Sequence, residues 1–504
     1  MRPIVKDAGG SALMWVLPPL AATFLMWLAR LNEITLFEFL GAAGLLTAAW
    51  GPYYSWRRAG ERYLPLFPML SFMYWVFYAL GLFWGTRSSY TARGQLSDQA
   101  IENAMLLAVV GVVCLWVGKW TGVGRRLASP RVLDIHPGSE NTWSYVRTAL
   151  LLSLPLTFGV QSRAYLFGNG GRQLLMILTS TVPMALFVML FRKWLRRQAN
   201  HGEVLLIAVF LIGRFLAGIA SGWLGTGVAI MVICSVAFLY ERRRIPALVV
   251  VVVLAYVLFF QAGKEAFRKT FWGERVDSTL SQRISFWSSE SLRSWELTLE
   301  NPNADNWRRL ADQSLGRVSL LQQTANVLDL TPEVVPYQRG RLYTYMLVTF
   351  IPRALWEDKP SVNDANQFYQ VAYGLTDPDH LSSVSIAVGT LAESFINFGW
   401  WGPLLIMIPL GIFFDYFQHA FLARDSGWVF NAAGIALIPN FLAIESQLAQ
   451  YLAGILQCIV VVLLILWPVL HVSMREEKTA PQPDASSRVP GGLRMPLPVT
   501  RRFL

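Results

Sequence analysis

The residues best suited to binding an anionic group lie in the stretch GRLYTYMLVTFIPRALWEDKPSVND, from Gly340 to Asp364. Prolines bracket Arg353 and Lys359 there, on a predicted turn between apolar segments. An arginine offers a planar, permanently charged fork to phosphate oxygens, and a lysine adds a compact point charge. The pair predicts a site for a diphosphate group, and the alternative is that both are ordinary interfacial basic residues.

Candidate acid–base residues follow in the stretch SVSIAVGTLAESFINFGWWG, from Ser383 to Gly402. Glu393 and Asn397 are four residues apart, which places them on one face of a helix. A carboxylate there can take a proton from an attacking sugar hydroxyl, with Asn397 orienting it. The alternative is that Glu393 pairs with an arginine or caps local structure. His380 is a second candidate base, although loop histidines are often merely solvated.

One arginine, Arg214, lies in an apolar run, LIGRFLAGIASG. Charge in such a run is expensive and asks for a function or a partner. We interpret Arg214 either as an anion-binding residue facing an outward cavity or as a structurally paired or snorkelling side chain. Glu38, in another apolar run, is interpreted as structural.

The composition identifies the elements that must position these residues. Of 504 residues, 54% are hydrophobic and only 15% are charged, against about 25% charged in soluble domains. A membrane helix needs roughly 17–25 mainly apolar residues. We expect an all-α polytopic protein with about twelve such helices. The predicted spans are 11–29, 34–50, 64–84, 103–118, 144–160, 173–191, 204–219, 225–240, 246–262, 398–414, 429–443 and 450–470.

The distribution of basic residues predicts the orientation of these spans. With the amino terminus inside, the inner segments hold 23 of the 43 Lys and Arg residues and the short outer loops hold five. Because basic loops stay in the cytoplasm, we expect both termini there. The net charge of +11 is then a topology signal, and we expect no nucleic-acid partner.

The predicted organisation has four parts. Nine helices in 1–262 precede a large outer loop at 263–397, three helices in 398–470 follow, and a disordered cytoplasmic tail occupies 471–504. The outer loop carries 16 acidic and 13 basic residues and contains amphipathic stretches, so we expect the chemistry there.

Motifs of soluble enzymes are missing from the sequence. It contains no HExxH, GxSxG, GxxxxGK[ST] or paired DxD motif, and its three cysteines lie in apolar runs without metal-ligand spacing. We therefore expect no cofactor and no metal site. Any glycosyl donor used on the outer side would be lipid-linked.

With these features, the chain resembles the Wzy-type polymerases of O-antigen and exopolysaccharide repeat units, found in bacterial inner membranes. The likeness rests on Arg317, on Gly340 followed by Tyr343, on FIPRALWEDKP and on LAESFINFGWWG. In relatives a Ser-Arg-Gly run often opens the eighth helix. Here the stretch from Ala220 to Gly225 has no arginine, and Arg214 is the candidate substitute.

The resemblance implies a GT-C-type glycosyltransferase that moves a growing glycan from undecaprenyl diphosphate to the next lipid-linked repeat unit, without a metal. Glu393 or His380 would activate the acceptor. The residues implied to hold diphosphate or sugar are Arg214, Arg317, Arg341, Tyr343, Arg353, Lys359 and Asn397.

The implied partners are lipid-linked oligosaccharides, membrane lipids, a chain-length regulator and a flippase. Three alternative functions stay open, one of which is a non-catalytic assembly or sensor component. An O-antigen ligase would use the same chemistry on another acceptor, and a transporter of lipid-linked glycans would need no catalysis.

Overall fold

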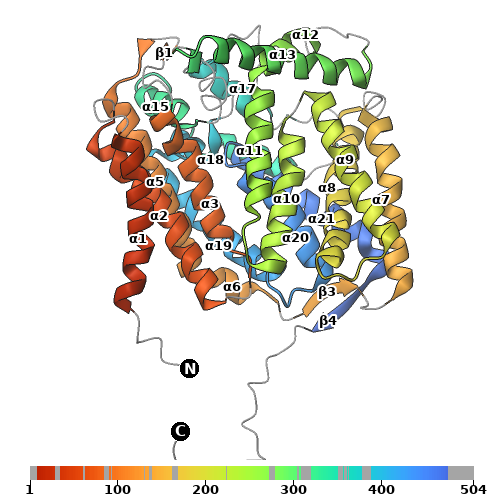
Figure 1. Ribbon diagram of the computed structural model, residues 1–504. Helices are drawn as coiled ribbons and strands as arrows, with labels where there is room; N and C mark the ends of the chain where they lie inside the picture. Colours follow the sequence, from red (N-terminus) through yellow and green to blue (C-terminus); the bar gives the residue numbers. More distant parts are fainter. Residues whose placement is uncertain are drawn as a thin grey trace, which may run out of the picture.

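Long helices that run side by side dominate the computed structural model (Figure 1). The structure describes residues 8–28, 34–60, 63–84, 90–91, 94–129, 131–135, 139–161, 168–222, 224–271, 278–303, 306–307, 319–349, 356, 360, 363–376 and 388–474. The predicted disordered tail lies outside these residues from position 475 onward.

The helices before the predicted outer loop are α1 (Ala8–Leu28), α2 (Leu36–Ala59), α3 (Leu66–Trp75), η1 (Val76–Leu80), α4 (Gly81–Trp84), α5 (Asp98–Trp120), α6 (Val123–Leu127), α7 (Glu140–Gln161), α8 (Gly168–Leu195), α9 (His201–Ser221), α10 (Leu224–Arg242) and α11 (Ala247–Ala262). The later helices are α12 (Lys264–Phe271), α13 (Leu280–Glu300), α15 (Leu321–Leu330), η4 (Arg341–Tyr343), α16 (Thr344–Thr349), α17 (Asn363–Ala372), α18 (Gly389–Phe398), η6 (Gly399–Trp401), α19 (Gly402–Phe421), α20 (Gly427–Leu442), α21 (Leu448–Leu466) and η7 (Trp467–Val469).

Two short antiparallel strand pairs accompany the helices and were not predicted. Strand β1 (Tyr90–Thr91) pairs with β2 (Gly94–Gln95), and β3 (Arg131–Ile135) pairs with β4 (Leu470–Met474). In the second pair Arg131 lies opposite Met474, so the segment that follows α21 is tied to the segment that precedes α7. This strand pair joins distant parts of the chain at one end of the helix bundle (Figure 1).

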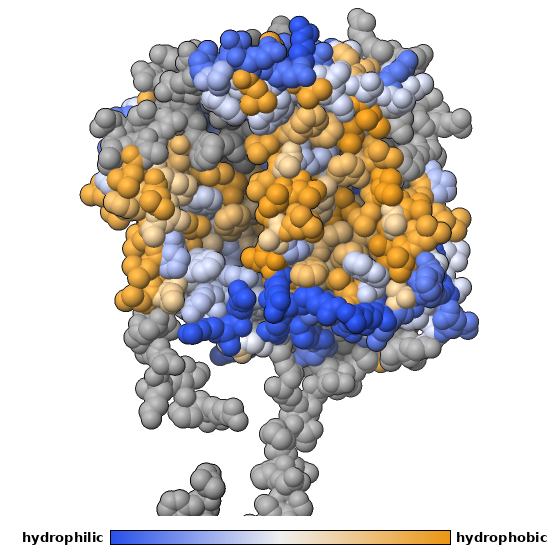
Figure 2. All heavy atoms as spheres, in the orientation of Figure 1, coloured by the Kyte–Doolittle hydropathy of each residue, from blue (hydrophilic) through white to orange (hydrophobic). Residues whose placement is uncertain are grey.

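The two ends of the bundle are polar and the band between them is apolar (Figure 2). At one end α12 and α13 lie across the bundle, and we call this the α13 side (Figure 1). At the other end lie β3 and β4, and we call this the β3 side. Helices α2, α5, α8 and α10 carry basic residues in their last turns, and they end on the β3 side. An apolar band between polar ends is the pattern of a membrane protein.

Local sequence signals start several of these helices. In α2 the Thr35 backbone N–H donates to Glu38 Oε2 at 2.9 Å, and the Glu38 backbone N–H donates to Thr35 Oγ1 at 3.3 Å. Asn200 and Glu203 form the same capping box at the start of α9. Each box satisfies two backbone groups that a helix start leaves without partners. The interpretation of Glu38 as a structural residue is therefore confirmed.

The expectation of about twelve membrane spans is wrong by the measure of helix length and apolarity. Among the residues that the structure describes, six helices are long and apolar enough to cross a membrane, and counting α11 with α12, bent by 55°, as one broken span adds a seventh. The six are Leu66–Phe83, Asp98–Trp120, His201–Ile219, Leu224–Arg242, Gly389–Phe421 and Leu448–Val469.

Helix length and polar ends explain the difference. Helices α11 and α20 have 16 residues each, which gives a length of about 24 Å at 1.5 Å per residue, short of the roughly 30 Å of hydrocarbon. Others begin with polar residues, such as Glu140 and Asn141 in α7. An apolar run in the sequence therefore does not guarantee a spanning helix.

Helices α5 and α19 approach each other at backbone distance, and this contact fixes the position of α18. A Cβ added to Gly411 would lie 2.2 Å from the Leu115 carbonyl oxygen, and one added to Gly118 would lie 2.3 Å from that of Ile408. Small residues permit such close approach between membrane helices. Because η6 and α19 follow α18 almost without a break, the α5–α19 contact also holds α18.

The hairpin of α12 and α13 covers the α13 side of α9, α10 and α11. Phe267 and Trp287 are fully buried in a small apolar core with Tyr256 of α11. The Trp287 indole N–H donates to the Phe260 carbonyl at 2.8 Å. One of the amphipathic stretches predicted in the outer loop thus lies in α13, and it packs on the ends of the apolar helices.

Ion pairs at the β3 side link α8 to α9 and to α10. Arg192 and Arg196 contact the Glu241 carboxylate at 2.7 and 3.1 Å, joining α8 to α10. Lys193 contacts the buried Glu203 at 2.7 Å, joining α8 to α9. Because these charges are paired and partly buried, breaking one pair would leave an uncompensated charge. We interpret them as structural.

Candidate functional site

A buried carboxylate, Glu393, lies at the centre of α18. Its side chain has no exposed surface. Oε2 accepts a hydrogen bond of 2.6 Å from the backbone N–H of Leu448, the first residue of α21. A helix start has a partial positive charge and spare N–H donors, so it stabilises a carboxylate there. One oxygen of Glu393 therefore caps α21, as the structural alternative anticipated.

The second oxygen faces a different environment. Within the described part of the chain, Glu393 Oε1 and the hydroxyls of Tyr369 and Tyr343 are buried and have no hydrogen bond of normal geometry. The Tyr369 side chain interacts with the Glu393 carboxylate, and the Tyr343 side chain interacts with Asn397. Tyr369 comes from α17 and Tyr343 from η4. Buried polar atoms almost always have partners. Three neighbouring atoms whose hydrogen bonding is incomplete thus mark a place where water or a substrate would complete it.

The electrostatics of this group keep its phenols protonated. Burial raises the pKa of the Tyr369 phenol well above its usual value, and the Glu393 carboxylate raises that pKa further. The same two causes, in the same order, raise the pKa of Tyr343, where Asn397 acts in the opposite direction. Both hydroxyls therefore remain donors at neutral pH.

Asn397 lies one turn beyond Glu393 and holds a turn of the chain against α18. Its Nδ2 donates to the Glu393 carbonyl at 2.9 Å, and its Oδ1 accepts from the Gly340 N–H at 3.0 Å. The Asn397 carbonyl accepts from the Arg339 N–H at 3.1 Å. The predicted shared helical face is confirmed, but Asn397 bonds the main chain of Glu393 and not its carboxylate.

The turn held by Asn397 carries Arg341, one of the arginines that the sequence predicted as a site residue. Gly340 has a φ of +88°, and a Cβ there would lie 3.3 Å from the Phe398 ring. A left-handed conformation this close to a ring requires glycine. Arg341 follows directly and is exposed, and Arg339 before it is exposed as well. The turn thus places Tyr343 inside and two guanidinium groups outside.

Other buried polar atoms lie on the elements around α18. Gln370 Oε1, next to Tyr369 on α17, Gln323 Oε1 on α15 and Glu445 Oε2 before α21 have no partner in the described ranges. The Asn326 side chain donates to the Tyr373 carbonyl at 3.0 Å, which joins α15 to α17. We call Gln323, Tyr343, Tyr369, Gln370, Glu393 and Glu445 the α18 polar cluster.

The loop before α21 closes the cluster from the side of the bundle. The Thr390 N–H donates to the Ile444 carbonyl at 3.3 Å, and its hydroxyl donates to the Ser446 carbonyl at 2.7 Å. Burial raises the pKa of the neighbouring Glu445. A cavity of about 10 Å³ under Thr390, also lined by Tyr74, has room for about one water molecule.

The remaining predicted site residues fall into two groups. Arg214 is buried in α9, and its Nη1 donates to the Thr179 carbonyl of α8 at 3.1 Å, which fits the structural alternative. It does not belong to the elements of the α18 polar cluster. The other predicted residues lie outside the described residues. They are Arg317, Arg353, Lys359 and His380.

Four members of the cluster, Gln323, Tyr369, Gln370 and Glu445, were not predicted from sequence. Tyr369 and Gln370 lie in the segment NDANQFYQVA, whose tyrosine and amides on an amphipathic helix were an available signal. Glu445 lies in a short loop between two apolar helices, where a carboxylate is unusual. Where the structure describes the chain, no group of three or more His, Cys, Asp or Glu residues is arranged to hold a metal ion.

The comparisons with known proteins place the segment from α7 through α19 within a family. No curated protein and no solved structure matches the chain. A family model described as a domain of unknown function, DUF8712, matches residues 139–421. The match runs from α7 through α19, so it includes α17, α18 and the turn at Gly340. Because it spans more than half of the 504 residues, the chain belongs to the DUF8712 family.

Proposed function

We propose that this protein is a polysaccharide polymerase. In this proposal it transfers a growing glycan from undecaprenyl diphosphate to an incoming lipid-linked repeat unit, as the resemblance to Wzy-type enzymes implies. The α13 side faces the periplasm, and the fold is of the GT-C type. The apolar helices and the basic helix ends at the β3 side support a bacterial inner-membrane protein with both termini in the cytoplasm.

The observation that carries the proposal is the hydrogen bonding of the Glu393 carboxylate, which is complete at one oxygen and incomplete at the other. Oε2 is fixed by the Leu448 N–H at 2.6 Å, whereas Oε1 has no hydrogen bond of normal geometry, although Tyr369 interacts with this carboxylate. Oε1 is therefore the oxygen proposed to accept a proton. A general base must be held in place and have an acceptor atom free for its substrate. Glu393 meets both requirements, on a helix held by the close α5–α19 contact.

The reaction follows from these groups. The acceptor hydroxyl oxygen attacks the anomeric carbon of the donor glycan, its proton moves to Glu393 Oε1, and the bond from the anomeric carbon to the diphosphate oxygen breaks. The diphosphate leaves as an anion. Arg341 at the turn, together with Arg353 and Lys359, is proposed to neutralise that charge. Tyr343 and Tyr369 donate hydrogen bonds to the bound sugar.

Substrate entry requires the turn at Gly340 to move, because the Glu393 side chain is fully buried. The turn is attached to α18 through two backbone hydrogen bonds and the Asn397 side chain, and its outer surface is exposed. Displacing it would open a path to Tyr343 and Glu393. The acceptor would then reach a base shielded from bulk water, where charges interact more strongly.

The test is a reconstituted polymerisation assay. Purified protein in vesicles is supplied with undecaprenyl-diphosphate repeat units, and the products are separated by size. The wild type is expected to form a ladder, and Glu393→Gln is expected to lower its rate by roughly 10²–10⁴-fold, the usual contribution of a general base.

A matched control comes from the β3 side. Asp415 is a buried carboxylate whose Oδ2 accepts from the Arg125 N–H at 2.7 Å. Asp415→Asn keeps an oxygen that accepts from the Arg125 N–H, just as Glu393→Gln keeps one that accepts from the Leu448 N–H. Asp415→Asn is expected to retain the ladder. A ladder unchanged by Glu393→Gln would refute the assigned base. Transfer of a single glycan to another acceptor, without a ladder, would replace polymerase by ligase.

A further inference from the structure

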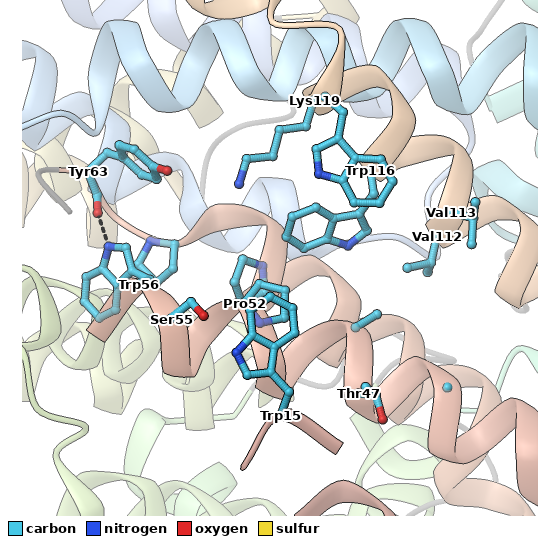
Figure 3. Close-up of a pocket in the computed structure, with 15 residues that line it drawn as sticks. Trp15, Thr47, Pro52, Ser55, Trp56, Tyr63, Val112, Val113, Trp116 and Lys119 are labelled. Atoms are coloured by element: carbon cyan, nitrogen blue, oxygen red, sulfur yellow. Dashed lines mark hydrogen bonds between the residues drawn. The ribbon is translucent and has the colours of Figure 1, made fainter. Parts of the chain in front are cut away.

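A groove opens between α1, α2, α3 and α5, away from the α18 polar cluster (Figure 3). Its volume is about 460 Å³, within the roughly 300–1,000 Å³ of ligand sites. The lining is mostly apolar; its polar residues are Thr47, Ser55 and Tyr63, and Lys119 lies at one end. The side chains that define it are Trp15, Pro52, Trp56, Trp116 and Lys119.

We propose that this groove binds an anionic phospholipid, with an acyl chain along the apolar lining and the headgroup at Lys119. The position of the groove along the helices supports a lipid. It extends from Val112, near the middle of α5, to Lys119 in the last turn on the β3 side. Seven helical residues span about 10 Å, a large part of the roughly 15 Å of one hydrocarbon leaflet.

The charge at the end of the groove matches an anionic headgroup. Lys119 Nζ lies 4.7 Å from the Trp116 ring centroid and 5.0 Å from that of Phe67. Ring faces attract a cation, so these rings keep the ammonium group at this end of the groove. Arg243, over Trp56 at 5.5 Å, adds a second positive charge at this end. Basic residues at the end of an apolar groove suit a phosphate attached to an acyl chain.

Two glycines shape the apolar part of the groove. The Trp15 ring packs on Gly51, where a Cβ would lie 2.7 Å from the ring. At Gly44, by contrast, a Cβ would meet no atom within 4 Å, because it would point into the open groove. Apolar space that the chain leaves unfilled at membrane depth is space for a hydrocarbon chain. This inference does not depend on the proposed polymerase, whose site lies elsewhere.

Native mass spectrometry of the full-length protein tests the proposal. The protein is reconstituted in vesicles of phosphatidylglycerol and phosphatidylcholine in equal amounts, extracted gently, and examined for retained lipid. We expect the wild type to retain phosphatidylglycerol. Gly44→Leu fills the groove with a good helix-forming residue and is expected to abolish retention.

The matched control is Gly454→Leu in α21, where a Cβ also meets nothing within 4 Å and the residue does not line the groove. It is expected to retain lipid like the wild type. Lys119→Met is expected to lower the preference for phosphatidylglycerol about fivefold, since a basic residue near an anionic lipid contributes about 1 kcal/mol. Lys119→Arg is expected to keep that preference.

Three results would overturn the proposal: retention by Gly44→Leu equal to that of Gly454→Leu, loss of lipid in both variants, or an unchanged lipid preference in Lys119→Met. Thermal unfolding of all variants in the same detergent establishes that each is folded. An unfolded Gly44→Leu is replaced by Gly44→Val, which narrows the same space and carries the same expectation.

Discussion

Replacing Glu393 in two ways separates its structural role from its chemical role. Glu393→Ala removes the acceptor of the Leu448 N–H bond, which is 2.6 Å long and buried at the start of α21. A buried donor left without a partner costs about 1–3 kcal/mol. Glu393→Gln keeps an amide oxygen for that N–H, so its cost is expected to be below about 1 kcal/mol.

These costs translate into measurable differences in melting temperature. For a protein larger than about 150 residues, 1 kcal/mol shifts Tm by roughly 2 °C. Glu393→Ala is therefore expected to lower Tm in detergent by roughly 2–6 °C, and Glu393→Gln by less than about 2 °C. In the polymerisation assay, however, both variants are expected to lose roughly 10²–10⁴-fold in rate, because both lack the carboxylate.

The pattern of stability and activity decides the role of Glu393. Near-wild-type Tm with lost activity in Glu393→Gln supports a chemical role for Oε1. If the two variants instead lower Tm equally, the reasoning from the Leu448 cap is refuted. If Glu393→Gln is as active as the wild type, Glu393 is only a cap.

Three further predictions concern backbone packing and titration. Gly340→Ala strains a φ of +88° by about 1 kcal/mol; it is expected to displace the turn and increase protease cleavage there. Gly411→Ala places a Cβ 2.2 Å from the Leu115 carbonyl oxygen, and it is expected to lower Tm more than the control Gly454→Ala. Burial raises the pKa of Glu445, so folding favours its protonated form; this contribution is full below the unfolded value and is lost as the pH rises through the raised pKa. Glu445→Gln is therefore expected to flatten the fall of Tm as the pH rises from the unfolded pKa through the raised pKa, and an unchanged pH profile would contradict the assignment.

The membrane character of the protein follows from composition, because apolar runs separated by basic segments have few alternatives in a bilayer. The number of membrane spans does not follow from composition. Run length alone suggested about twelve helices, whereas six of the described helices satisfy length and apolarity together. Helix ends and bends decide this number, and they depend on caps and packing, as the 55° break between α11 and α12 illustrates.

In the candidate site, too, the sequence predicts some features of single residues and only the tertiary structure decides the others. The sequence by itself determined that Glu393 and Asn397 share a helical face, because a spacing of four is a local property of helices. Only the tertiary structure decided what surrounds them. Leu448 lies 55 positions away and donates to one carboxylate oxygen, while Tyr369 of α17 lies beside the same carboxylate. Neither contact has a local signature, because both arise from helix packing that brings distant segments together.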